Sequence, residues 1–141
     1  MTPEIDWLAK WNLYSPKAVA VFDEPSGREI TYGKLFRKSK ALALKLRADF
    51  GIQAGDRVAV MATNCVEYIP LFFAIQRLNA IMVPVNFRLT TREVEHIIQD
   101  SGARLFIYEQ NFAHIADDLS IIHDFKVDKT TETPAIAEIE K

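Results

Sequence analysis

The chain has 141 residues, of which 49% are hydrophobic and 26% are charged, and its formal net charge is −2. This balance is typical of one folded globular domain and excludes a disordered polyelectrolyte, while the slight negative charge gives no global attraction to nucleic acid. Lysines and arginines crowd residues 34–47 and acidic residues dominate from Glu109 onward. We interpret both charge runs as solvated surface.

The first elements are a short helix and a hairpin. Residues 5–13 predict an amphipathic helix with Trp7, Leu8 and Trp11 on one side. Residues 18–31 predict a β-hairpin, because two short β-prone segments flank a stretch of turn-forming residues.

A long helix is expected next, with Thr31 as its N-cap and Gly51 as a left-handed stop. Residues 57–62 form a nearly continuous apolar run, which is typical of a strand buried on both faces of a parallel sheet.

Asn64 and Glu67 then have the spacing of a capping box and predict a helix that runs to about Leu78. Pro70 lies inside that helix and is expected to kink its first turns.

The second half of the chain continues the alternation. Residues 81–85 predict a strand, and Thr90 and Glu93 form a second capping box before a helix that ends at Gly102. Residues 104–108 predict another strand and residues 110–119 a short helix. Strands and helices joined by short connections predict an α/β fold, in which a parallel β-α-β layer follows the short helix and the hairpin. We assign residues 1–125 to one partial α/β subdomain and residues 126–141 to a polar tail or linker.

Candidate sites for chemistry are few. The spacing of the three histidines does not suit a zinc site, so no metal-binding residue is predicted. The single cysteine, Cys65, lies near a predicted helix N-terminus, where a thiolate would be stabilised, but a small buried apolar residue is the favoured interpretation. No glycine-rich phosphate loop is present.

Arg88 is the one candidate ligand-binding residue. It follows the strand at 81–85 and precedes a helix, and ligands of parallel α/β sheets gather at the carboxyl ends of strands. An arginine there is well placed for an anion. The alternative is that Arg88 pairs with Glu93 and only secures the loop.

Several stretches, taken in order, carry a family resemblance. The set comprises Trp11 with Ser15–Pro16, Ile30–Tyr32, Gly55–Val60, Asn64 with Glu67, Val83–Thr90 and Asp100–Ala103. Over residues 7 to 108 the chain resembles the N-terminal region of the adenylate-forming, AMP-binding acyl-activating enzymes. The residues at these motif positions are most similar to those of acyl-CoA and aryl-CoA synthetases. The resemblance implies that the α/β layer is the start of the large N-terminal domain of that fold.

The resemblance also implies a two-step acid–CoA ligase that uses ATP, Mg²⁺ and coenzyme A. In the family, a Ser/Thr/Gly-rich loop ending in Pro-Lys-Gly holds the ATP phosphates, a Thr-Glu pair binds magnesium, an Asp holds the ribose, and a C-terminal Lys catalyses adenylation. None of these motifs occurs in this chain. The arginine of the Pro-x-Asn-x-Arg-Leu stretch touches the nucleotide end of coenzyme A in some members, and here it is Arg88. Asn79 stands where the family has glycine, and Phe87 where it often has proline.

We consider two functions, which belong to different classes of protein. In the first, the chain is the N-terminal segment of a ligase, binds no cofactor by itself, is inactive alone and has the remainder of the parent enzyme as its partner. In the second, it is a stand-alone, non-catalytic interaction module that self-associates or binds a partner through exposed apolar surface. The N-terminus lacks a signal-peptide pattern and no apolar run reaches membrane-spanning length, so we expect a cytoplasmic protein without integral membrane contact and without nucleic-acid binding.

Overall fold

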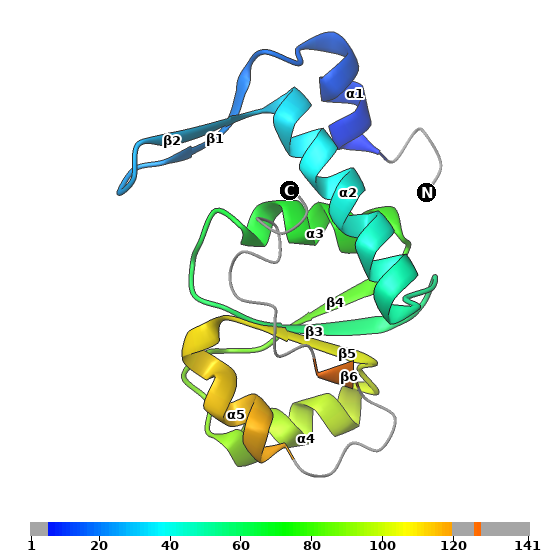
Figure 1. Ribbon diagram of the computed structural model, residues 1–141, viewed down its shortest axis with the longest axis vertical. Coiled ribbons are helices and arrows are strands. Elements are labelled where there is room, and N and C mark those ends of the chain that lie inside the picture. The colour runs from blue at the N-terminus through cyan, green and yellow to red at the C-terminus, as the bar shows by residue number, and fades with distance from the viewer. Residues whose placement is uncertain (1–5, 120–125, 128–141) are drawn as a thin grey trace.

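The computed structural model describes residues 6–119 and 126–127, which form a short helix and a hairpin beside a parallel α/β layer (Figure 1). This arrangement confirms the predicted fold class. The elements are, in chain order, α1 (Trp7–Tyr14), β1 (Val19–Asp23), β2 (Arg28–Thr31), α2 (Tyr32–Phe50), β3 (Arg57–Met61), α3 (Tyr68–Arg77), β4 (Ile81–Pro84), α4 (Thr91–Ser101), β5 (Leu105–Tyr108), the 3₁₀ turn η1 (Gln110–Phe112), α5 (Ala113–Asp118) and β6 (Lys126–Val127).

The main sheet has the strand order β4-β3-β5-β6, and every neighbouring pair is parallel. From β3 the chain passes through α3 to β4 on one side, then returns through α4 to β5 on the other side. In Figure 1, α2 and α3 cover one face of the sheet while α4 and α5 cover the opposite face. The strand order therefore reverses at β3, and the carboxyl ends of β3 and β5 flank the point where ligands of such sheets commonly bind.

Both faces of β3 are buried, which explains its continuous apolar sequence. Val58 and Val60 belong to the core cluster that includes Leu46 of α2 and Ile75 of α3. Ala59 and its neighbour Met61 belong instead to the cluster formed with α4, β5 and α5. A strand between two helical layers needs apolar residues at successive positions, as the sequence predicted.

Local signals placed most helix ends correctly. The Thr31 side chain accepts a hydrogen bond from the Lys34 N–H, and Gly51 ends α2 in the left-handed conformation at φ 65°. Thr90 and Glu93 form the predicted capping box at the start of α4. Gly102, at φ 66°, ends that helix. These ends are satisfied by the side chains and backbone conformations that helix termini require.

The start of α3 was predicted wrongly. The helix begins at Tyr68, and Glu67 makes no side-chain cap hydrogen bond, so Asn64 and Glu67 form no capping box. Pro70 consequently lies in the first turn, where a backbone N–H has no partner within the helix and its absence costs nothing. The later start removes the reason for expecting a kink at Pro70.

The short N-terminal elements pack at one end of α2. Leu8 of α1 is buried with Ile30, Leu35 and Val66 in a separate core cluster. Of the side chains expected on the apolar side of α1, Trp7 is 69% exposed and Trp11 is 42% exposed. A search of the described residues finds no helix long and apolar enough to cross a membrane.

Candidate ligand site at the carboxyl edge of the sheet

Three loops meet where the parallel strands end, and we call residues 62–67, 85–90 and 109–112 the carboxyl-edge loops. The Val85 N–H donates to the Val60 carbonyl at 2.8 Å, and the Glu109 N–H donates to the Met61 carbonyl at 3.1 Å. These two hydrogen bonds continue the ladder past the ends of β4 and β5. The loops therefore leave the sheet side by side, around the reversal at β3.

Arg88 lies on the loop between β4 and α4 and is exposed. Its backbone N–H donates to Asn86 Oδ1 at 3.0 Å, which fixes the turn. The guanidinium carbon lies 5.6 Å from the centre of the Phe87 ring. Phe87 in turn stacks on Phe112 of the loop after β5, with ring centres 6.3 Å apart. The structure thus places Arg88 at the carboxyl edge, beside a second loop, with its charge reachable from solvent.

Glu93 does not serve as the acid partner of Arg88. Its Oε2 accepts hydrogen bonds from the Thr90 N–H at 2.8 Å and from the Thr90 hydroxyl at 3.0 Å. These bonds lower the pKa of Glu93, the backbone one most strongly. Among the residues that the structure describes, no carboxylate forms an ion pair with Arg88. Within this described part of the chain, the Arg88 guanidinium therefore has no carboxylate partner.

A buried carboxylate at the same edge was missed by sequence reasoning. Glu109 had been grouped with the acidic surface run, yet it is only 6% exposed. Its Oε1 accepts hydrogen bonds from the Thr63 N–H at 3.1 Å and from the Thr63 hydroxyl at 2.7 Å. The assignment of Glu109 to solvated surface is therefore wrong. A position directly after a fully buried strand was the available signal.

The surroundings of Cys65 disfavour its nucleophilic thiolate form. Burial raises the pKa of Cys65 to about 11, and the nearby charges of Glu67 and Glu109 add to the rise. The cysteine is partly buried and lies ahead of α3, whose first residue is Tyr68. The raised pKa favours the protonated thiol, but the side chain is only partly buried, in contrast to the buried position expected for a small apolar residue.

The described residues contain no group of three metal-ligating side chains. His96 and His114 are exposed, and His123 lies outside the described residues. The carboxyl-edge loops offer one exposed guanidinium, Arg88, which suits an anion, and one buried carboxylate, Glu109, whose hydrogen bonds from Thr63 join two of the loops.

Comparison with known proteins places this geometry in a family. A family model described as AMP-binding enzyme matches residues 8–140. The chain is 39% identical over 104 residues to a fatty acid–[acyl-carrier-protein] ligase, ScoC, of Streptomyces coeruleorubidus, covering 74% of this chain and 20% of that protein. It is 40% identical over 106 residues to a long-chain-fatty-acid–CoA ligase of Salmonella typhimurium, covering 72% of this chain and 19% of that protein.

Solved structures agree with the sequence matches. The N-terminal domain of FACL13 from Mycobacterium tuberculosis superposes with a TM-score of 0.82 at 29% identity, over 95% of this chain and 35% of that one. The chain spans about a fifth of the length of the curated relatives that it matches.

Proposed function

Because the chain belongs to the AMP-binding enzyme family, we propose that it is the N-terminal segment of an ATP-dependent acid–CoA ligase and that its contribution there is structural. Such a ligase joins a carboxylic acid to AMP with release of pyrophosphate, and coenzyme A then displaces AMP to give the thioester. The superposition of the parallel α/β layer on the N-terminal domain of FACL13, over 95% of this chain, is the observation that carries the proposal.

The isolated chain is proposed to be inactive. It lacks the Pro-Lys-Gly loop, the magnesium-binding Thr-Glu element and the C-terminal Lys that the family uses. The described residues also offer no three-ligand set for Mg²⁺, so no metal step is assigned to them. Acid-dependent ATP–pyrophosphate exchange by the purified chain tests this part. We expect no exchange above the blank with any carboxylic acid, and clear exchange would contradict the proposal.

For the whole ligase we propose one exception to a purely structural contribution, a contact between Arg88 and the nucleotide end of coenzyme A, as the family resemblance implies. An exposed guanidinium that pairs with no acid of residues 6–119 suits a phosphate of the nucleotide end. In a ligase that contains this segment, Arg88→Ala is expected to raise the KM for coenzyme A by about tenfold, the loss of one charge-assisted hydrogen bond. Acid-dependent ATP–pyrophosphate exchange, which needs no coenzyme A, should be unchanged.

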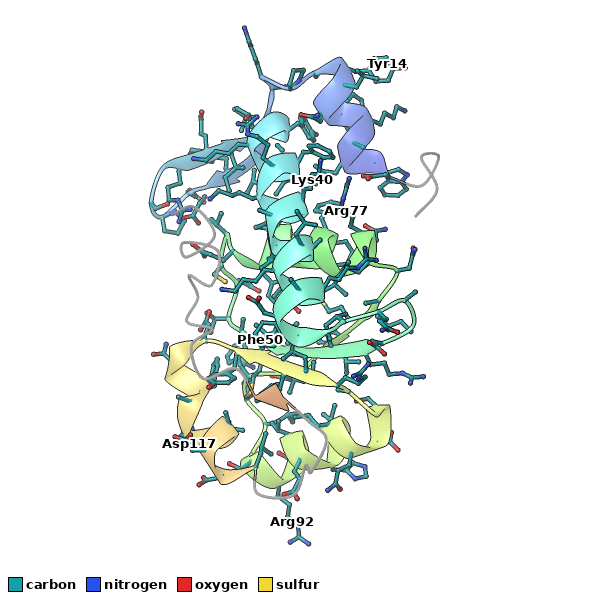
Figure 2. The ribbon with its side chains drawn as sticks, turned by 45° about the vertical axis from the view of Figure 1, so that its right-hand side comes forward. Tyr14, Lys40, Phe50, Arg77, Arg92 and Asp117 are labelled. Carbon is teal, nitrogen blue, oxygen red and sulfur yellow. The ribbon has the colours of Figure 1, made fainter. Side chains whose placement is uncertain are left out.

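Arg92→Ala is the matched control, because Arg92 is another exposed arginine that projects outward from α4 (Figure 2). A KM for coenzyme A that rises equally in both variants would contradict the role of Arg88.

A second function, the non-catalytic interaction module, is favoured by one observation. Leu13 is 75% exposed and Tyr14 is 70% exposed at the end of α1, where Tyr14 points away from the body (Figure 2). Together with Trp7 they leave apolar surface bare. In the ligase proposal the remainder of the parent enzyme is the partner of this segment. A gene that stops directly after Lys141 and a chain that sediments as a stable oligomer would favour the module instead.

We also propose that residues 1–125 form a subdomain and residues 126–141 a tail or linker. Lys126–Val127 pairs with β5 as the short strand β6, so the first two residues of this tail join the main sheet. Residues 128–141 lie outside the described residues. The cytoplasm remains the proposed location.

A further inference from the structure

The β1–β2 hairpin is a two-stranded sheet that is separate from the main sheet. Its base is anchored, because Ile30 is 2% exposed and the Tyr32 N–H donates to the Ala18 carbonyl at 3.0 Å. Towards the tip the side chains are mostly exposed, including Phe22 at 60%. A lone two-stranded hairpin is marginally stable in water, so the position of the tip depends on what it contacts elsewhere.

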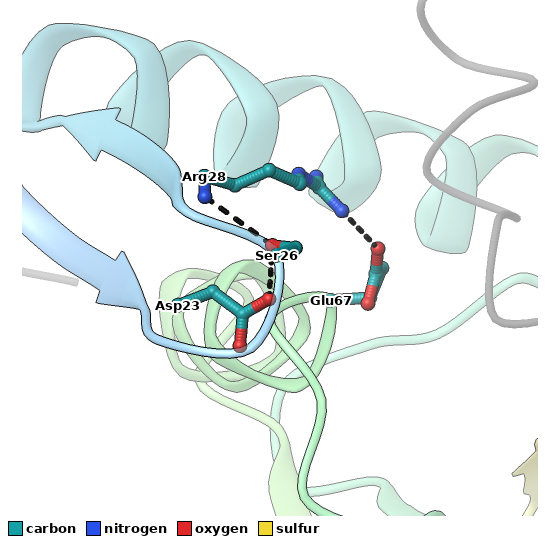
Figure 3. A network of polar contacts seen from close by, with 4 residues as sticks. All are labelled: Asp23, Ser26, Arg28 and Glu67. Atoms are coloured by element: carbon teal, nitrogen blue, oxygen red, sulfur yellow. Dashed lines mark hydrogen bonds and ion pairs between the residues drawn. The ribbon is translucent and has the colours of Figure 1, made fainter.

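The turn at the tip is internally fixed and presents Arg28 (Figure 3). The Gly27 N–H donates to the Asp23 carbonyl at 2.8 Å, with Gly27 in the left-handed conformation at φ 69°. The Ser26 hydroxyl donates to the Asp23 carboxylate and accepts from the Arg28 N–H at 3.2 Å. These hydrogen bonds hold the turn in one conformation and fix the backbone from which Arg28 extends.

One ion pair joins this tip to the rest of the molecule. A guanidinium nitrogen of Arg28 lies 3.1 Å from Glu67 Oε1, across 39 residues of sequence (Figure 3). The side chains are 49% and 25% exposed. Exposed pairs of this kind contribute little stability, so the contact can break readily.

Between the hairpin and the loop after β3 lies an open groove. One wall is Val21, Phe22 and Asp23 of β1, and the other is formed by residues 64–66 with Tyr68 and Ile69. Cys65, the only cysteine of the chain, lines the groove and is partly buried. The groove thus has one wall on the main body and one wall on the hairpin, and the Arg28–Glu67 pair connects them.

We propose that the hairpin (residues 19–31) is a flap over this groove, fixed at its base by Ile30 and held closed at its tip by the Arg28–Glu67 ion pair. Opening the flap widens the groove and increases the exposure of Cys65, which is partly buried when the ion pair is formed. A closure that depends on one exposed pair responds to ionic strength, because salt screens solvent-exposed charges. This inference does not depend on the proposed ligase function.

The test uses Cys65 as the reporter, since a chain with one cysteine gives one labelling rate. The rate of reaction with a small thiol-reactive disulfide is measured over a range of pH and salt. The pH profile gives the thiolate fraction at each salt concentration, and the rate is divided by that fraction because Glu67 and Glu109 raise the pKa of Cys65. In Arg28→Gln this corrected rate should rise about two- to fivefold, the range expected for loss of one exposed ion pair. The corrected wild-type rate should rise with salt towards that of Arg28→Gln, whose own corrected rate should not change.

Control variants separate flap opening from other causes. Glu67→Gln also removes a charge that raises the pKa of Cys65. It should therefore shift the pH profile as well as the rate. Arg104→Gln breaks a comparable ion pair with Asp56, 2.9 Å long, at the amino edge of the sheet, and should label like wild type.

The charge-swapped double variant, Arg28→Glu with Glu67→Arg, should restore slow labelling once the rate is corrected for the thiolate fraction, because the swap also removes the negative charge that raises the pKa of Cys65. Far-UV circular dichroism checks that each variant is folded. Labelling of folded Arg28→Gln at the wild-type rate, or a wild-type rate that does not respond to salt, would overturn the proposal.

Discussion

Replacing Glu109 with alanine is expected to destabilise the chain by about 2–4 kcal/mol. The carboxylate accepts two hydrogen bonds from Thr63 at a site where Glu109 is 6% exposed. Hydrogen bonds to a charged group contribute roughly 1.5–3 kcal/mol each, and relief of the buried charge offsets part of their loss. Alanine also leaves the Thr63 N–H and hydroxyl without their acceptor. The connection between the loops after β3 and β5 would be lost.

Two milder variants separate the contribution of the Glu109 charge from that of the Thr63 hydroxyl. Glu109→Gln keeps an acceptor oxygen and loses the charge, so a cost of about 1 kcal/mol is expected. Thr63→Val removes the hydroxyl while keeping the backbone donor, and should cost about 1–2 kcal/mol. In the double variant of Thr63→Val with Glu109→Ala, the costs should fall short of additivity by about 1–2 kcal/mol, because both changes delete the same hydrogen bond.

Urea denaturation followed by far-UV circular dichroism measures these free energies of unfolding. Glu24→Ala, at an exposed position in the hairpin turn, is the control and should change stability by less than about 0.5 kcal/mol. A Glu109→Ala variant as stable as this control, or costs that add without coupling to Thr63, would refute the reasoning.

Three further predictions concern single residues. Because burial raises the pKa of Cys65 from 9.0 to about 11, the folded chain holds the thiol proton more tightly than the unfolded chain. The free energy of unfolding of the chain should therefore fall as pH rises from 9.0 to about 11, with a smaller fall in Cys65→Ala. Urea titrations at each pH would show this. Asn79 has a left-handed backbone at φ 55°, so Asn79→Ala should lower stability by about 1 kcal/mol while Asn79→Gly preserves it in the same assay. Thr90→Ala should cost about 1 kcal/mol by removing the cap of α4, with lower helicity at the α4 amides in NMR chemical shifts.

Much of the fold could be predicted because its signals are local. The apolar run at β3, the cap at Thr31 and the stop at Gly51 each depend on a few neighbouring residues and on the helix or strand that they begin or end. Asn79 likewise adopts the left-handed conformation that its position in place of glycine suggested. Parallel topology followed from short connections and strands buried on both faces.

At the start of α3 two local sequence signals conflict, the capping-box spacing and the proline. The spacing of Asn64 and Glu67 favours a helix from that point, but such a helix would place Pro70 where its ring and missing N–H are costly. Starting at Tyr68 removes the conflict and frees Glu67 to pair with Arg28. That partner lies 39 residues away, and no local pattern could reveal it.

The candidate site was predicted only in part. Arg88 could be placed at the carboxyl edge because it lies in the short loop between a predicted strand and the next helix. The burial of Glu109 depends on Thr63, which lies 46 residues earlier and becomes its neighbour only when β3 and β5 pair. The stacking of Phe87 on Phe112 likewise joins two loops that are distant in sequence.

The central claim is that the 141-residue chain is the inactive N-terminal segment of an acid–CoA ligase. Acid-dependent ATP–pyrophosphate exchange tests it most directly, when it is measured on this chain and on the product of the reading frame continued past Lys141. The account predicts no exchange by the chain and exchange with at least one carboxylic acid by the longer product. Exchange by the 141-residue chain alone, or a reading frame that ends at Lys141, would contradict it.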